Sequence, residues 1–107
     1  MSSSKELAAF SSLMKSMSAD KRVLATHVSL LTALFIFWQR HGFISPFAIT
    51  RKTVMAYSKI ASIVTYHKCI KELDKYGYIR YQPSFHPAKG SLVYWPDSAK
   101  ANSFLAV

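Results

Sequence analysis

Several residue types are scarce in this chain, and each scarcity excludes a class of protein. Cys69 is the sole cysteine among 107 residues, so an intramolecular disulfide is impossible and we expect a cytoplasmic protein. The three glycines lie far apart and form no phosphate-binding glycine-rich loop. The five carboxylates are scattered and form no pair suited to general acid–base catalysis. We therefore expect neither enzymatic activity nor a cofactor.

Long hydrophobic runs are also missing. The most apolar stretch, residues 28–38 (VSLLTALFIFW), has eleven residues, whereas a membrane-spanning helix needs about 20. We expect no membrane-spanning segment and no membrane partner.

Positive charge is abundant and unevenly distributed. Fourteen Lys/Arg against five Asp/Glu give a net charge of +9 and a pI near 9.9. This balance is typical of proteins that bind nucleic acid or an anionic membrane, although it can also serve solubility alone. Residues 51–100 hold nine Lys/Arg and three Asp/Glu, whereas residues 1–50 hold five and two. The distribution favours nucleic acid over membrane attachment through the first half.

The first half of the chain has the pattern of two helices. Apolar residues at helical spacing predict helices over residues 5–17 and 21–40, the second capped by Ser18 or Asp20 and ended by His41–Gly42. Residues 28–38 are apolar nearly all the way round, and such a helix must be covered on every side. The first helix or a second copy of the chain could supply the cover. We expect a homodimer through residues 5–40.

The second half alternates short helices with short strands. Thr50 is the expected N-cap of its first helix, and Gly77 is expected to end its second. Alternating side chains predict a β-hairpin with the loop PSFHPAKG. The expected elements are a strand at residues 47–49, a helix at 51–57, a turn at 58–61, a helix at 62–76 and strands at 78–82 and 91–95.

This order of elements is the layout of a winged helix-turn-helix. The predicted fold class is mainly α with a small β-hairpin (α+β), with two extra N-terminal helices. We expect one domain over residues 1–107, divided into dimerisation helices (1–42), a winged helix-turn-helix core (43–96) and a tail (97–107).

The helix over residues 62–76 has two unlike faces. At 100° per residue, Tyr66, Ile70 and Leu73 share one face, which predicts a stripe directed at the core. The opposite face carries one apolar and three basic residues, Val64, Lys68, Lys71 and Lys75.

An exposed basic face of this kind suits duplex DNA, because each neutralised phosphate releases condensed counterions. Thr65, His67 and Lys68 lie in the first half of the helix and are the expected base-reading residues, with Val64 against a thymine methyl group. A solvated lysine face with no ligand is the alternative. Further cations on the preceding helix and on the hairpin favour DNA. The expected DNA-binding residues are Arg51, Lys52, Lys59, Val64, Thr65, His67, Lys68, Lys71, Lys75, Arg80, His86 and Lys89.

The segment CIKELDKYGYIRY, residues 69–81, resembles the winged-helix superfamily, including transcriptional regulators of the multiple-antibiotic-resistance type. Leu73, Gly77 and Ile79 match the leucine, the helix-ending glycine and the first strand residue of that family. The turn at residues 60–66 is one residue longer than in those regulators, and the loop lacks their Asp-x-Arg motif. More loosely, the chain is similar to small winged-helix proteins of bacterial mobile elements. Both resemblances imply DNA binding, in transcription control, replication initiation or excision.

Two other kinds of site are conceivable, a metal site and an aromatic surface that binds single-stranded nucleic acid, and ordinary packing is the alternative to both. His67 and Cys69 lie about 200° apart around their helix and cannot share one ion, so we expect no metal site. Cys69 is expected to pack as a small hydrophobe. Most hairpin aromatics are expected in the core, with Phe85 exposed at the loop tip.

The sequence therefore predicts a sequence-specific double-stranded DNA-binding protein, a small bacterial transcriptional or mobile-element regulator. The alternative is a protein-interaction module in which the apolar helix at residues 28–38 binds a partner and the winged helix is only a scaffold.

Overall fold

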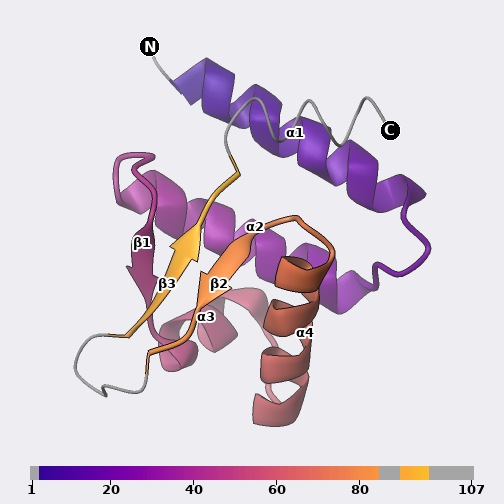
Figure 1. Ribbon diagram of the computed structural model, residues 1–107, viewed down its shortest axis with the longest axis vertical. Coiled ribbons are helices and arrows are strands. Elements are labelled where there is room, and N and C mark those ends of the chain that lie inside the picture. Colours follow the sequence, from indigo (N-terminus) through magenta and orange to yellow (C-terminus); the bar gives the residue numbers. More distant parts are fainter. Residues whose placement is uncertain (1–2, 85–89, 97–107) are drawn as a thin grey trace.

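The structure is a computed structural model that describes residues 3–84 and 90–96. Over these residues it is mainly helical, with one small antiparallel sheet, which confirms the expected α+β class (Figure 1). No helix in these two ranges is long and apolar enough to cross a membrane. The elements are α1 (Ser3–Ala19), α2 (Ala25–Arg40), β1 (Phe47–Ile49), α3 (Arg51–Ser58), α4 (Ile63–Lys75), β2 (Arg80–Gln82) and β3 (Ser91–Tyr94).

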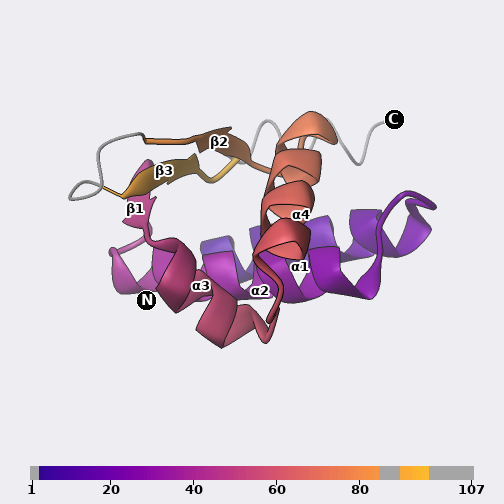
Figure 2. The same cartoon turned by 90° about the horizontal axis from the view of Figure 1, so that it is seen from below.

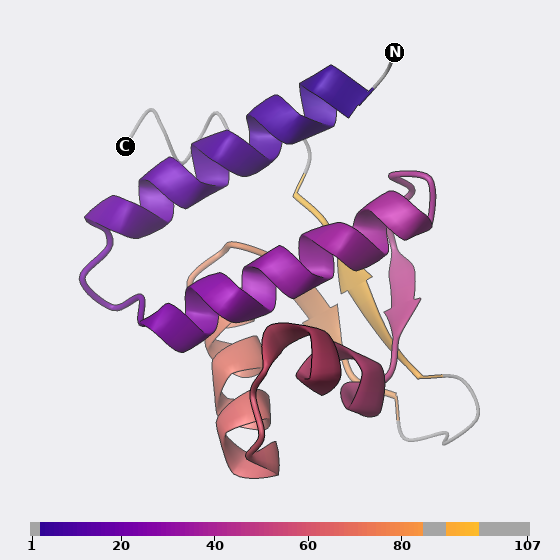
Figure 3. The same cartoon turned by 180° about the vertical axis from the view of Figure 1, so that it is seen from behind.

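Helix α2 is the centre of the fold. It lies between α1 on one side and α3 on the other, and α4 and the sheet cover a further side (Figures 1 and 3). Leu30, Leu31 and Leu34 have no exposed surface, and Thr32 is the one exposed residue of the stretch 28–38. A single chain therefore covers its most apolar helix, and the shortage of cover from which the homodimer was inferred is not found.

The sheet places β3 between β1 and β2, and both pairings are antiparallel. Val93 of β3 lies opposite Phe47 of β1 and Tyr81 of β2. Phe47 and Val93 belong to the hydrophobic core, so one face of the sheet contributes to it. The strand predicted at residues 47–49 is confirmed and joins the hairpin as a third strand.

The second helix begins at Ala25, later than predicted, because Asp20 does not cap it. The Asp20 carboxylate accepts hydrogen bonds from the Arg22 side chain and from the Tyr78 hydroxyl. The N-cap is Leu24, whose backbone N–H donates to Nδ1 of His27 at 2.8 Å. His27, three residues after the N-cap, takes the place that glutamate or glutamine has in a capping box, where a side chain accepts from the N–H of the N-cap residue.

The first strand of the hairpin also begins later than predicted, at Arg80. Helix α4 ends in a Schellman motif, in which Gly77 has φ +88°. The N–H of Tyr78 donates to the carbonyl of Leu73, and the N–H of Gly77 donates to that of Asp74. Residues 78 and 79 complete this helix end before the strand can begin.

Gly90 should be the less replaceable of two glycines with positive φ. Its φ is +66°, and a Cβ would lie 2.6 Å from the carbonyl oxygen of Ile49, whereas Gly42 has φ +68° and open space around it. Gly42→Ala should cost only the left-handed strain, about 1–2 kcal/mol. Gly90→Ala should cost clearly more, which urea denaturation would measure. Equal losses would contradict the close approach to Ile49.

Asp20 should make stability depend on acid pH. Hydrogen bonds from Arg22, and a further one from Tyr78, hold the pKa of the Asp20 carboxyl well below its ordinary value of 3.8. A lowered folded-state pKa stabilises the fold above the unfolded value, and this stability is lost as pH falls through the folded value. The free energy of unfolding should fall below about pH 4, and less steeply in Asp20→Asn, by denaturant titration at several pH values. Identical profiles would exclude this contribution.

Candidate nucleic-acid interface

Helices α3 and α4 are joined by a tight connection of four residues. Thr50 caps α3 as predicted, because its side chain accepts from the backbone N–H of Thr53. The helix extends through Ser58, one residue past its expected end, and Lys59 then takes a left-handed conformation with φ +63°. Ser62 caps α4 by accepting from the N–H of Thr65 at 3.2 Å. The hydroxyl of Ser29 on α2 donates to the carbonyl of Ser58 and fixes the turn to the central helix.

Helix α4 has a buried face and an open face, as its periodicity predicts. Tyr66 is 2% exposed, and Ile70 and Leu73 have no exposed surface, so the predicted core stripe is confirmed. Val64 is 78% exposed. We call its face the lysine ridge, which comprises four exposed residues, Val64, Lys68, Lys71 and Lys75.

The two carboxylates of α4 are directed away from the lysine ridge. Oε1 of Glu72 lies 2.9 Å from Nε2 of His27 on α2, and Oδ2 of Asp74 accepts from the N–H of Tyr81 at 3.3 Å. In the described part of the chain, no carboxylate pairs with a lysine of the ridge. Within residues 3–84 and 90–96, the three positive charges of the ridge therefore have no ion-pair partner.

Three further cations lie along α3 and the turn. Arg51, Lys52 and Lys59 are exposed, and they border an open groove of about 670 Å³. The apolar side chains of the groove include Met55, Ile60 and Ile63. These three cations therefore surround a groove that reaches the first residue of α4, Ile63.

The remaining predicted residues differ in how accessible they are. Arg80 is exposed, with its guanidinium 5.2 Å from the ring centre of Tyr94. Thr65 and His67 are half-buried, and the His67 ring meets Tyr66 edge-on at 5.3 Å. His86 and Lys89, together with Phe85, lie outside the described residues.

The N-terminal end of α4 and the free end of the β2–β3 pair lie toward the same end of the molecule, at the bottom of Figure 1. Figure 2, seen from that end, shows α3 beside α4 and the strand pair to one side. None of the helices and strands in the described ranges covers this end in either view.

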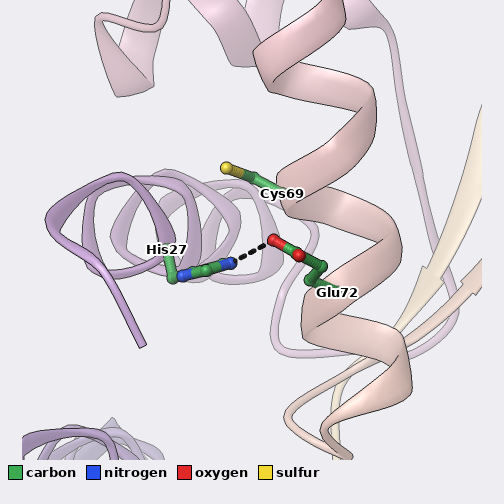
Figure 4. A group of neighbouring side chains, drawn as sticks. All are labelled: His27, Cys69 and Glu72. Atoms are coloured by element: carbon green, nitrogen blue, oxygen red, sulfur yellow. Dashed lines mark hydrogen bonds and ion pairs between the residues drawn. The ribbon is translucent and has the colours of Figure 1, made fainter. Parts of the chain in front are cut away.

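One contact was missed by sequence reasoning. His27 and Glu72 are 45 residues apart and meet across α2 and α4, with Cys69 beside them (Figure 4). From the sequence, only His67, on the same helix, could be compared with Cys69 as a possible metal ligand. No local spacing indicates a partner from another helix, so only the packing of α4 on α2 reveals this cluster.

Comparison of the chain with protein-family models, with curated proteins and with solved structures gives no match.

The cap at Ser62 should matter for α4, since one side-chain acceptor satisfies an N–H at its first turn. Ser62→Ala should lower the free energy of unfolding by about 1 kcal/mol. Ser62→Asn retains an acceptor and should restore most of the loss. Urea denaturation of the three proteins would measure both effects, and equal losses in the two variants would show that the cap contributes nothing.

Proposed function

We propose that the protein binds double-stranded DNA sequence-specifically, as a small bacterial transcriptional or mobile-element regulator in the cytoplasm. In this proposal residues 43–96 form the winged helix-turn-helix core, which packs on α2 and has α4 as its recognition helix. The element order α2, β1, α3, α4, β2, β3 supports it, as does the central position of β3.

The observation that carries the proposal is the lysine ridge. Its lysines are exposed, they lack ion-pair partners among the described residues, and both carboxylates of α4 bond elsewhere. A lysine face that only served solubility would gain nothing from this separation. The separation of lysines from carboxylates favours binding to an anionic groove, because a carboxylate beside the lysines would repel the phosphates.

The side chains fit the two kinds of contact that DNA requires. Lys71 and Lys75 lie in the second half of α4 and would bind phosphates, which fix orientation but carry no sequence information. Lys68 lies nearer the N-terminal half, where recognition helices contact base edges, and a lysine there can donate to guanine O6 and N7. Val64, the most exposed large apolar side chain of the described residues, suits a thymine methyl group.

A homodimer through residues 5–40 remains part of the proposal, although less apolar surface is available for it. Since α2 is covered within one chain, the surface available for pairing is the outer side of α1, where Leu7 is 59% exposed.

For the alternative, a protein-interaction module, residues 28–38 would have to offer an apolar surface. Their leucines are buried, so no observation favours that alternative.

Selection of bound sequences from a random duplex pool, at two salt concentrations, tests the function directly. Enrichment of a defined sequence at both concentrations would support it, and a twofold-symmetric site would support the dimer. Binding that disappears at the higher concentration without sequence enrichment would reduce the function to charge attraction.

Loss of one ridge lysine should change the salt dependence of binding. Lys71→Ala should reduce the slope of log affinity against log salt by about one unit, because one phosphate contact is lost. Fluorescence anisotropy with a labelled duplex at several salt concentrations would measure it. Lys15→Ala is the matched control, since Lys15 is an exposed lysine of α1 and its loss changes the net charge equally. Equal slopes for the two variants would remove Lys71 from the interface.

A further inference from the structure

Three metal-ligating side chains meet where α4 packs on α2. Nε2 of His27, Sγ of Cys69 and a carboxylate oxygen of Glu72 all lie within 4.8 Å of one another. His27 is 1% exposed and Cys69 is 3% exposed, and Glu72 is half-buried. Figure 4 shows the three side chains directed into the same space from two helices.

The cap of α2 fixes which nitrogen of His27 faces the cluster. Nδ1 accepts the backbone N–H of Leu24 at 2.8 Å, and Nε2 lies 2.9 Å from Oε1 of Glu72. Because Nδ1 accepts, the proton of the neutral ring lies on Nε2 and is donated to Glu72. Nε2 is thus the nitrogen directed at the other two donors, and it can bind a metal once its proton has left.

The donor set matches the chemistry of zinc. Imidazole nitrogen, thiolate sulfur and carboxylate oxygen all bind Zn²⁺, at about 2.0–2.1, 2.3 and 2.0–2.2 Å respectively. Tetrahedral geometry at those lengths separates neighbouring donors by roughly 3.5 Å. Small side-chain rotations, which move the donor atoms by about an ångström, would bring the three donors to that spacing.

We propose that His27, Cys69 and Glu72 form a binding site for Zn²⁺ or a similar thiophilic divalent cation, with water in the fourth position. Glu72 is the most exposed of the three, so the ion and the water would reach the cluster from its side. Cys69 and Glu72 lie on the flank of α4 between the core stripe and the lysine ridge, and the site does not depend on DNA binding.

Binding requires two proton movements, and each has a structural consequence. The Cys69 thiol releases its proton to solvent and binds as thiolate. The ring proton of His27 moves by exchange with water from Nε2 to Nδ1, so the N–H of Leu24 loses its acceptor. The N–H of Leu24 and the new Nδ1–H then both need water as acceptor, and Leu24, a residue 59% exposed, places this end of α2 at the surface. The ion therefore links α2 to α4 while releasing the cap at the start of α2.

Titration of the metal-free full-length chain with Co²⁺ tests the site. We expect one equivalent of Co²⁺ to produce a thiolate-to-cobalt charge-transfer band in the near ultraviolet, and Zn²⁺ to displace it. Cys69 is the sole cysteine, so the band can arise only there. A backbone NMR spectrum should show the Leu24 amide signal shifting with the same stoichiometry.

Variants separate a metal site from a hydrogen-bonded pair that only packs two helices. Cys69→Ser should abolish the band. Glu72→Gln and His27→Asn, which can still accept the N–H of Leu24, should each weaken binding by more than roughly 100-fold, the upper range for loss of an outer partner. His67→Gln, on the same helix but outside the cluster, should bind as the parent does. Circular dichroism would establish that each variant is folded.

The result that overturns the site is absence of the band with excess Co²⁺ in folded parent protein. A band of unchanged strength and affinity in folded Glu72→Gln or His27→Asn would equally exclude the three-residue site. A Leu24 amide that does not respond to the ion would remove His27 from the ligand set.

Discussion

The fold depends on the cover of α2. A helix that is apolar on nearly every side is unstable in water unless other elements bury it, and each fully buried leucine contributes about 1.5–3 kcal/mol. Here α1, α3, α4 and the sheet all contact α2, and Leu30, Leu31 and Leu34 are completely enclosed. Helix α4 covers α2 with only one of its faces. Its other face is left to solvent, and the charged residues of the helix lie on it or at its border.

The carboxylates of α4 are kept apart from the lysines on its solvent-exposed face. A carboxylate beside the lysine ridge would neutralise part of its field, because unit charges a few ångströms apart interact strongly even near a protein surface. Glu72 instead bonds to His27 and Asp74 to the backbone of Tyr81. The same two bonds hold the helix to α2 and to the start of β2. Charge separation and attachment of the helix thus come from the same residues.

Local periodicity was sufficient to predict the elements and the two faces of α4, because both depend on residues three or four apart. It was not sufficient to predict how α2 is covered, since that depends on elements far apart in the sequence. The cap at Leu24 was missed because the N-cap residue itself has no side-chain acceptor, and the acceptor for its N–H is a histidine three residues later, where a capping box usually has glutamate or glutamine. The His27–Glu72 contact was missed because no pattern in either helix indicates a partner 45 residues away. Each error concerns a tertiary contact or a helix end, where local spacing carries little information.

The direction of the lysine ridge is set at both ends of α4. At the N-terminal end, the Ser62 cap and the bond from Ser29 to Ser58 fix the turn to α2. At the C-terminal end, Glu72 is held by His27, and the Schellman motif fixes the exit into β2. A straight helix fixed at both ends cannot rotate about its axis without breaking one set of bonds. Because the core stripe lies between these ends and is fully buried, rotation would also expose apolar surface. The outward face is therefore a consequence of inward contacts, and a change at His27, Cys69 or Glu72 acts on the ridge through the same rigid helix.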